Sequence, residues 1–219
     1  YIALSDDQYS TAVPIGFNFR HYTNAYSTAF IHSNGFIGFT TFGGNHTVPQ
    51  TNPSATGPNN LIAAAHHDLN PPVGTGAIYY ATLGTAPDRR FVVEWKDVQE
   101  WNVANSPQTF QLVLYEATQS FEIRHLSMRN PTTRTFGVGF ENATGTIGLS
   151  IAYTNTGVSE RAWHAGPERL LVTGISTPRS AGTPSGITVE ARGANGLRLT
   201  SYTGTVRFSS TDAAATLPA

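Results

Sequence analysis

The sequence contains no cysteine and few charged residues. Without cysteine, disulfide frameworks, thiolate metal sites and cysteine nucleophiles are all excluded. Charged residues make up 12% of the chain, well below the ~25% of an average protein. The 13 basic and 14 acidic side chains give a formal net charge of −1, so the chain lacks the basic surface that attracts nucleic acids and anionic lipids. It also has no uninterrupted apolar run near the ~18 residues of a membrane-spanning helix. We therefore expect no nucleic-acid partner and no membrane-spanning segment.

Glycine, proline and aromatic residues are abundant. The chain has 21 Gly, 13 Pro, 12 Phe and 9 Tyr among its 219 residues, and 39% of the residues are hydrophobic. This composition excludes intrinsic disorder, which is associated with few aromatics and a large net charge. It also argues against a helical bundle, because such bundles are rich in Ala, Glu, Lys, Leu and Arg.

Apolar residues recur with a period of two along most of the chain. Phe91, Val93 and Trp95 alternate with Glu94 and Lys96, as expected of a strand with one buried face. We expect the strand to end in a loop at 97–98. Similar alternation occurs at 111–115, 121–125, 136–140 and 147–153, and turn-forming residues such as Asn34-Gly35, Pro71-Pro72 and Asn130-Pro131 separate the segments. This spacing predicts an all-β fold, either an antiparallel β-sandwich or a barrel, and we expect the antiparallel β-sandwich. The apolar run at 61–65 lacks alternation and fits a strand buried on both faces or, alternatively, a single helical turn.

The character of the sequence changes near Glu168. Short β-like runs at 170–175, 187–189 and 206–208 follow, with a Ser/Thr/Pro/Gly stretch between the first two. We predict one domain over residues 1–168 and a second β module over 169–219. The second segment is about half of a ~100-residue immunoglobulin-like sandwich. We therefore expect that further residues follow in the natural protein or that another chain covers the exposed face. Since the chain opens at Tyr1 without a leader, we expect a processed chain or an excised fragment.

Both segments resemble known families. The sequence motifs of the first are LSDD at 4–7, IGFNF at 15–19, SNGFIGF at 33–39, NLIA at 60–63, DLNP at 68–71, IYY at 78–80, RRFVVEW at 89–95, FQLVLYE at 110–116 and ENATGT at 141–146. In this order they resemble the nidogen-like β domain of multimodular bacterial secreted and surface proteins. TPSGITV at 183–189 and YTGTV at 202–206 resemble the start of a bacterial immunoglobulin-like repeat. The resemblance implies an extracellular or cell-surface protein in which the repeat acts as a stalk.

His66, Asp68 and Asn70 form the densest cluster of potential metal ligands. In an extended segment, residues two apart share one face, so these three side chains would lie together. Carboxylate and amide oxygens suit calcium, and calcium is the metal we consider. Relatives often carry an aromatic residue followed by two acidic residues where this chain has His66, His67 and Asp68, which puts any cation role of the acidic pair in doubt. Alternatively, Asp68 caps the following turn. Asp6 and Asp7 offer carboxylates to a calcium site, or else form a solvated turn.

Trp101 and Tyr22 are candidate ligand-binding residues, because both are aromatic and flanked by polar residues. Flat aromatic faces pack on sugar rings. Glu94, Asp97 and Glu100 are carboxylates of the type that glycosidases use, but we expect Glu94 to face solvent, and no nucleophile motif with the required strand-to-helix context is present. We expect a protein that is not an enzyme.

The predicted function is adhesion or structural display at a surface, with recognition of glycan or protein through loops on a β scaffold. Two alternatives remain open. The first is an accessory domain of a secreted hydrolase. The second is a filament subunit whose incomplete sandwich is completed by a strand from a neighbouring copy.

Overall fold

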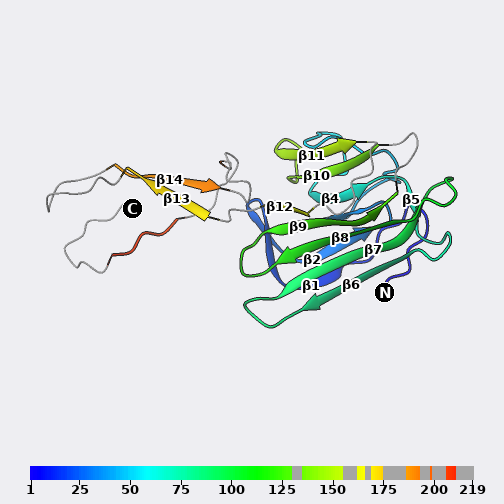
Figure 1. The fold of residues 1–219 in the computed structure, drawn as a ribbon, viewed down its shortest axis with the longest axis horizontal. Coiled ribbons are helices and arrows are strands. Elements are labelled where there is room, and N and C mark those ends of the chain that lie inside the picture. Colours follow the sequence, from blue (N-terminus) through cyan, green and yellow to red (C-terminus); the bar gives the residue numbers. More distant parts are fainter. Residues whose placement is uncertain are drawn as a thin grey trace. The chain divides into compact units, whose positions relative to one another are not determined.

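The structure is a computed structural model of the chain. It describes residues 1–129, 135–154, 162–165, 169–174, 186–192, 198 and 206–210. The chain divides into two compact units, Tyr1–Gly166 and Pro167–Ala219. Within the described residues every regular element is a β-strand, and every pair of neighbouring strands is antiparallel (Figure 1). The predicted all-β class is therefore confirmed. In this part of the chain no helix is long and apolar enough to cross a membrane.

The described residues of the first unit form two sheets. One is six-stranded, and its strands in spatial order are β1 (Val13–His21), β2 (Asn24–His32), β3 (Phe36–Gly38), β4 (Leu61–His66), β10 (Phe136–Glu141) and β11 (Gly148–Thr154). The other has the order β12 (Ala162–Ala165), β9 (Phe121–Met128), β8 (Gln108–Tyr115), β7 (Arg90–Glu100) and β5 (Leu69–Asn70), and β6 (Ala77–Leu83) also pairs with β7.

The buried core joins the two sheets face to face. Along β7, Phe91, Val93 and Trp95 are fully buried while Glu94 is partly exposed, so the predicted alternation is confirmed. The core cluster takes its side chains from both sheets; examples are Ile15, Ile31, Ile37, Ile62, Phe110, Leu112, Leu114 and Ile123. The predicted antiparallel sandwich therefore describes this unit.

β4 is buried on both faces, as the unalternated apolar run predicted. Two polar side chains of the second sheet form hydrogen bonds across the core to carbonyl groups of the first. Trp95 Nε1 on β7 donates to His32 O at 3.0 Å, and His125 Nε2 on β9 lies 2.8 Å from Ala64 O. Sliding one sheet over the other would leave these buried carbonyls without a donor, which is costly. The two bonds therefore fix the position of one sheet over the other.

The turn between β2 and β3 is formed by Asn34 and Gly35, as the sequence predicted. Gly35 has φ +81, and a Cβ added there would collide with Ala65 O, so glycine is required at this position. The Gly35 carbonyl accepts hydrogen bonds from the amides of Ala64 and Ala65, both at 3.0 Å. Asn34 is completely buried.

The expectation that β7 gives way to a loop at 97–98 is wrong. The strand continues to Glu100, and the register with β8 shifts between Trp95 and Val98. Asp97 has φ 52, as expected at a β-bulge. The extra residue breaks the alternation without ending the strand. Sequence periodicity alone does not distinguish a bulge from a strand end.

The second unit contains one antiparallel pair among its described residues. β13 (Arg169–Thr173) pairs with β14 (Thr188–Arg192) along their full length. Two parts of the motifs that resemble an immunoglobulin-like repeat, 183–185 and 202–205, lie outside the described residues.

Candidate functional site

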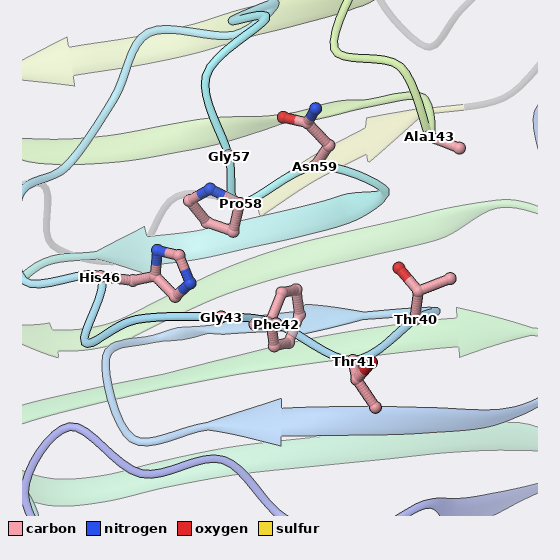
Figure 2. A pocket seen from close by; sticks show the side chains of 9 residues that line it. All are labelled: Thr40, Thr41, Phe42, Gly43, His46, Gly57, Pro58, Asn59 and Ala143. Atoms are coloured by element: carbon pink, nitrogen blue, oxygen red, sulfur yellow. The ribbon is translucent and has the colours of Figure 1, made fainter.

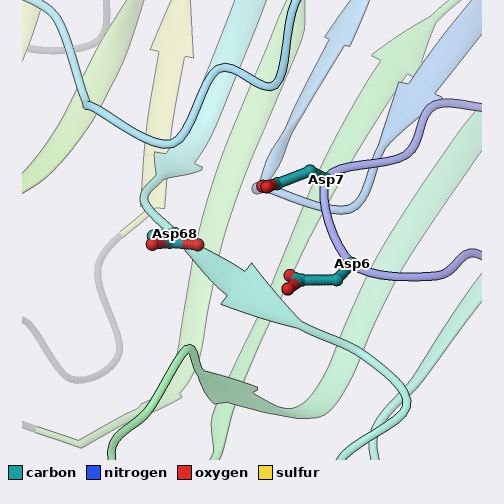
Figure 3. A group of neighbouring side chains, drawn as sticks. All are labelled: Asp6, Asp7 and Asp68. Atoms are coloured by element: carbon teal, nitrogen blue, oxygen red, sulfur yellow. The ribbon is translucent and has the colours of Figure 1, made fainter.

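Three carboxylates gather where the N-terminal turn meets the segment between β4 and β5 (Figure 3). One oxygen of each of Asp6, Asp7 and Asp68 lies within 4.8 Å of the others. The turn is closed by Gln8, whose Oε1 accepts hydrogen bonds from the Ser5 amide at 2.8 Å and from Ser5 Oγ at 3.0 Å. We refer to Asp6, Asp7 and Asp68 as the acidic group.

Burial and mutual repulsion set the electrostatics of the acidic group. Burial raises the pKa of Asp6, and the negative charge of Asp7 raises it further. Asp7 Oδ1 accepts a hydrogen bond from Asn34 Nδ2 at 2.9 Å. Asp6 Oδ1 is buried and accepts no hydrogen bond from any residue that the structure describes. A divalent cation would replace this repulsion with attraction, and hard oxygen donors are what Ca²⁺ prefers. The donor set therefore suits calcium.

The predicted metal set of His66, Asp68 and Asn70 spans the junction between β4 and β5. β4 ends at His66 and β5 begins at Leu69, so these residues do not lie on one continuous strand. Leu69 is buried in the core, and Asp68 and Asn70 flank it in sequence. Asn70 Oδ1 is buried and accepts no hydrogen bond from a described residue. His66 Nε2, by contrast, donates to His46 O at 2.8 Å. Metal binding by these residues stays a prediction.

Trp101 and Tyr22 differ in exposure. Trp101 follows β7 directly and is 43% exposed. Its backbone amide donates to Asp68 O at 2.8 Å, so the backbone of this exposed aromatic residue lies beside that of Asp68, one member of the acidic group. Tyr22 lies in the turn between β1 and β2 and is partly buried, with an inaccessible hydroxyl oxygen. Burial raises the pKa of the Tyr22 phenol, and the charge of Glu141 adds to this effect.

The three carboxylates of the glycosidase hypothesis lie in separate environments. Glu94 accepts a hydrogen bond from Gln111 Nε2 at 2.8 Å, and Asp97 Oδ1 accepts one from Thr109 Oγ1 at 3.2 Å. Glu100 is buried. Its Oε2 lies 3.1 Å from His67 Nε2, and its Oε1 accepts a hydrogen bond from Gln108 Nε2 at 2.8 Å. The His67–Glu100 pair links β7 to the end of β4.

Residues 39–60 connect β3 to β4 and form the β3–β4 loop. The loop contains no strand, and connections of this length are uncommon in compact domains unless they are functional or disordered. Here hydrogen bonds tie it to β10 and β11. Ser54 N donates to Glu141 Oε2 at 2.7 Å, Gln50 Nε2 donates to Glu141 Oε1 at 3.1 Å, and Asn52 N donates to Ser150 Oγ at 2.8 Å. The loop therefore has a defined shape on the sandwich.

A hollow of about 220 Å³ opens over the β3–β4 loop. Figure 2 shows that its lining comes from two stretches of this loop and from Ala143 in the turn after β10. The side chains that define its chemistry are Thr40, Thr41, Phe42, His46, Pro58 and Asn59. Hydroxyl and amide groups beside apolar rings suit an uncharged polar ligand. Sequence reasoning did not identify this hollow, because its lining residues form no motif.

His32, Phe36 and His66 of the sandwich form a cluster with Phe42 and His46 of the β3–β4 loop. The His32 ring stacks on Phe36 at 4.4 Å between ring centroids, and the His66 and Phe36 centroids are 4.7 Å apart. The His32 and His46 centroids are 5.7 Å apart. Burial lowers the pKa of His32 to about 3 and of His66 to about 4, and it lowers the pKa of His46 as well. All three rings are therefore neutral at pH 7.

The fold and its loops define an all-β sandwich module that presents a long structured loop. The model of the NIDO-related family matches residues 2–167, so the chain belongs to the NIDO-related family. Membership of this family fits an extracellular module in general and supports the resemblance of the first segment to a nidogen-like domain. No curated protein and no solved structure matches the chain.

Proposed function

We propose that the NIDO-related domain is a non-enzymatic adhesion module at a bacterial surface or in a secreted protein. It recognises a glycan or a protein through loops on the rigid sandwich. The observation that supports this most directly is the hydrogen bond from the backbone of Trp101 to Asp68. The backbone of an aromatic residue that is 43% exposed thereby lies beside that of Asp68, a member of the acidic group. Loops held by a rigid scaffold are the usual location of binding residues.

The two parts of this surface have complementary chemistry for a carbohydrate. The flat indole of Trp101 packs on the apolar face of a sugar ring. Calcium bound by the acidic group has open coordination positions for hydroxyl oxygens, because carboxylates from three residues fill only part of its shell of about six to eight oxygens. The low charge of the chain, 12% of residues, also suits a neutral partner.

A glycan array, probed with the chain in calcium and in EDTA, tests the proposal. We expect binding to selected glycans that is lost in Trp101→Ala. Tyr79→Ala is the matched control, because Tyr79 is 41% exposed but lies on β6. Equal losses in both variants would contradict recognition by Trp101. A blank array in both buffers would exclude glycans and leave a protein partner, to be sought by the same comparison of variants.

For residues 169–219 we propose the start of an immunoglobulin-like repeat that sets the reach of the module. The described β13–β14 pair is compatible with this proposal.

Self-association is the second candidate function. β6 is an edge strand that pairs with β7, and its exposed residues include Tyr79, Tyr80 and Leu83 at 41%, 37% and 43%. Such an edge is a template for pairing with another copy. Size-exclusion chromatography that yields a stable monomer at high concentration would contradict this candidate.

A further inference from the structure

The walls of the hollow over the β3–β4 loop belong to segments that hydrogen bonds hold in place. In the middle of the loop, the carbonyl of His46 accepts a hydrogen bond from His66 Nε2 at 2.8 Å. At the end of the loop, the amide of Asn60 donates to Asn142 O at 3.0 Å. This second bond joins the loop to the turn that carries Ala143. The hollow is therefore largely pre-formed, as sites for small ligands usually are.

The turn after β10 is a fixed wall as well. Asn142 Oδ1 accepts a hydrogen bond from the Thr146 amide at 3.0 Å, which closes the turn. Gly145 has φ +63, and a Cβ added there would collide with the carbonyl of Ser54 in the β3–β4 loop. The turn and the loop are thus packed backbone against backbone. Ala143 is held at the rim of the hollow by both.

The lining of the hollow is uncharged but chemically mixed. None of the nine residues that line it is Asp, Glu, Lys or Arg (Figure 2). Phe42 and Pro58 are buried and supply apolar ring surface. Thr40 is exposed, and Figure 2 shows its hydroxyl on the side that faces Asn59. A threonine hydroxyl and an asparagine amide each donate and accept hydrogen bonds.

These features match the chemistry of a sugar ring. A sugar carries hydroxyl groups that both donate and accept at its rim, and C–H groups on its faces, which pack on apolar rings. A charged ligand would lose its hydration here without gaining an opposite charge. The volume of about 220 Å³ lies below the ~300–1,000 Å³ of sites for drug-sized ligands. The hollow therefore has room for one ring rather than for a chain of several sugars.

We propose that this hollow binds one uncharged sugar ring, with a C–H face of the ring on Phe42 and Pro58 and its hydroxyl groups at Thr40 and Asn59. The inference rests on the proposed recognition of a glycan and adds a second place of contact to it. Neither Trp101 nor a member of the acidic group lines the hollow, so the two places can be tested separately.

Amide chemical shifts of the 219-residue chain, followed by NMR during titration, test the proposal. The probes are the methyl glycosides of glucose, galactose, mannose, N-acetylglucosamine and N-acetylgalactosamine. We expect at least one probe to shift the amides of residues 40–43, 57, 59 and 143 in a saturable manner. For a ligand of about 13–16 non-hydrogen atoms, we expect a Kd of about 1 mM. No shift at these amides with any probe, up to about 100 times that concentration, would overturn the proposal.

Ala143→Phe tests whether the hollow itself is the site. Ala143 is exposed at the rim, so the larger side chain fills the hollow without disturbing the core. We expect the affinity for the probe to fall at least tenfold. Ala117→Phe is the matched control, because Ala117 is equally exposed in the turn between β8 and β9. Wild-type affinity in Ala143→Phe, or an equal loss in both variants, would overturn the proposal.

Thr40→Val tests the hydrogen bonding, because valine has the shape of threonine without the hydroxyl. Loss of one hydrogen bond should raise the Kd about fivefold. Thr85→Val is the matched control, since Thr85 is exposed in the loop after β6. An unchanged Kd in Thr40→Val would overturn the assigned contact.

Trp101→Ala separates this inference from the proposed function. We expect this variant to bind the probe in the hollow with wild-type affinity. Glycan-array binding that is lost in Trp101→Ala, without any probe-induced shift at the hollow, would overturn the inference and leave the proposed function intact. Shifts at the hollow with a blank array would support the inference and contradict recognition of glycans by Trp101.

Discussion

Acidification to pH 5 should destabilise the first unit through its buried histidines. Burial lowers the pKa of His21 and His66 to about 4 and of His32 to about 3. The unfolded chain takes up protons near pH ~6.5 that the folded unit does not. Stability is therefore fully present above that pH and falls as the pH decreases toward the folded values. At ~1.4 kcal/mol per pH unit, each histidine loses about 2 kcal/mol at pH 5, and the three together about 6 kcal/mol.

Glu141 partly offsets this loss. Because burial raises its pKa to about 6, its protonation between pH 6 and 5 returns about 1.4 kcal/mol, which leaves a net loss of about 5 kcal/mol. Typical domains have only ~5–15 kcal/mol in total. Urea unfolding followed by circular dichroism at pH 7.5, 6 and 5 measures the loss directly. A free energy of unfolding that is equal at pH 7.5 and 5 would refute the reasoning. His21→Gln should reduce the pH dependence by about a third, since it removes one of three such groups.

Three further predictions concern the acidic group and the core. Calcium at about 100 times its Kd should stabilise the chain by about 2.7 kcal/mol, measured as a higher Tm in CaCl₂ than in EDTA. Asp68→Asn should abolish this difference in Tm. An identical Tm of the wild-type chain in both buffers would exclude the site. Gly35→Ala should lower the free energy of unfolding, measured with urea, by at least about 2 kcal/mol, because Gly35 has φ +81 and the Ala65 carbonyl lies beside it. An unchanged free energy would contradict the turn geometry. Trp95→Phe should cost about 1–3 kcal/mol, because His32 O loses its buried donor; an unchanged urea midpoint would show that this bond contributes nothing.

Local patterns predicted the strands well because each pattern records burial directly. The alternation of Phe91, Val93 and Trp95 reports one buried face, and the unbroken run at 61–65 reports two. The Asn34-Gly35 turn was predictable because few residues adopt its backbone conformation. The bulge at Asp97 was not, since its cause is the pairing of β7 with β8.

The candidate site was only partly predictable, because its residues are distant in sequence. Asp6 and Asp7 were recognised as possible ligands and Asp68 as another, but only the fold brings them together. His46 carried no sequence signal at all. Within the β3–β4 loop, its position is fixed by the hydrogen bonds that its carbonyl accepts from Asn34 and His66.

The side-chain amide of Asn34 makes these two regions interdependent. It has two hydrogens, yet three acceptors surround its nitrogen: Asp7 Oδ1 at 2.9 Å, Asn45 O at 3.1 Å and His46 O at 3.2 Å. An amide can satisfy two acceptors fully at one time. If one acceptor is withdrawn, for example when a cation draws the Asp7 carboxylate away, the two N–H donors of Asn34 shift toward the other two acceptors. A change in the N-terminal turn therefore alters the hydrogen bonds of residues 45 and 46 through a single buried side chain.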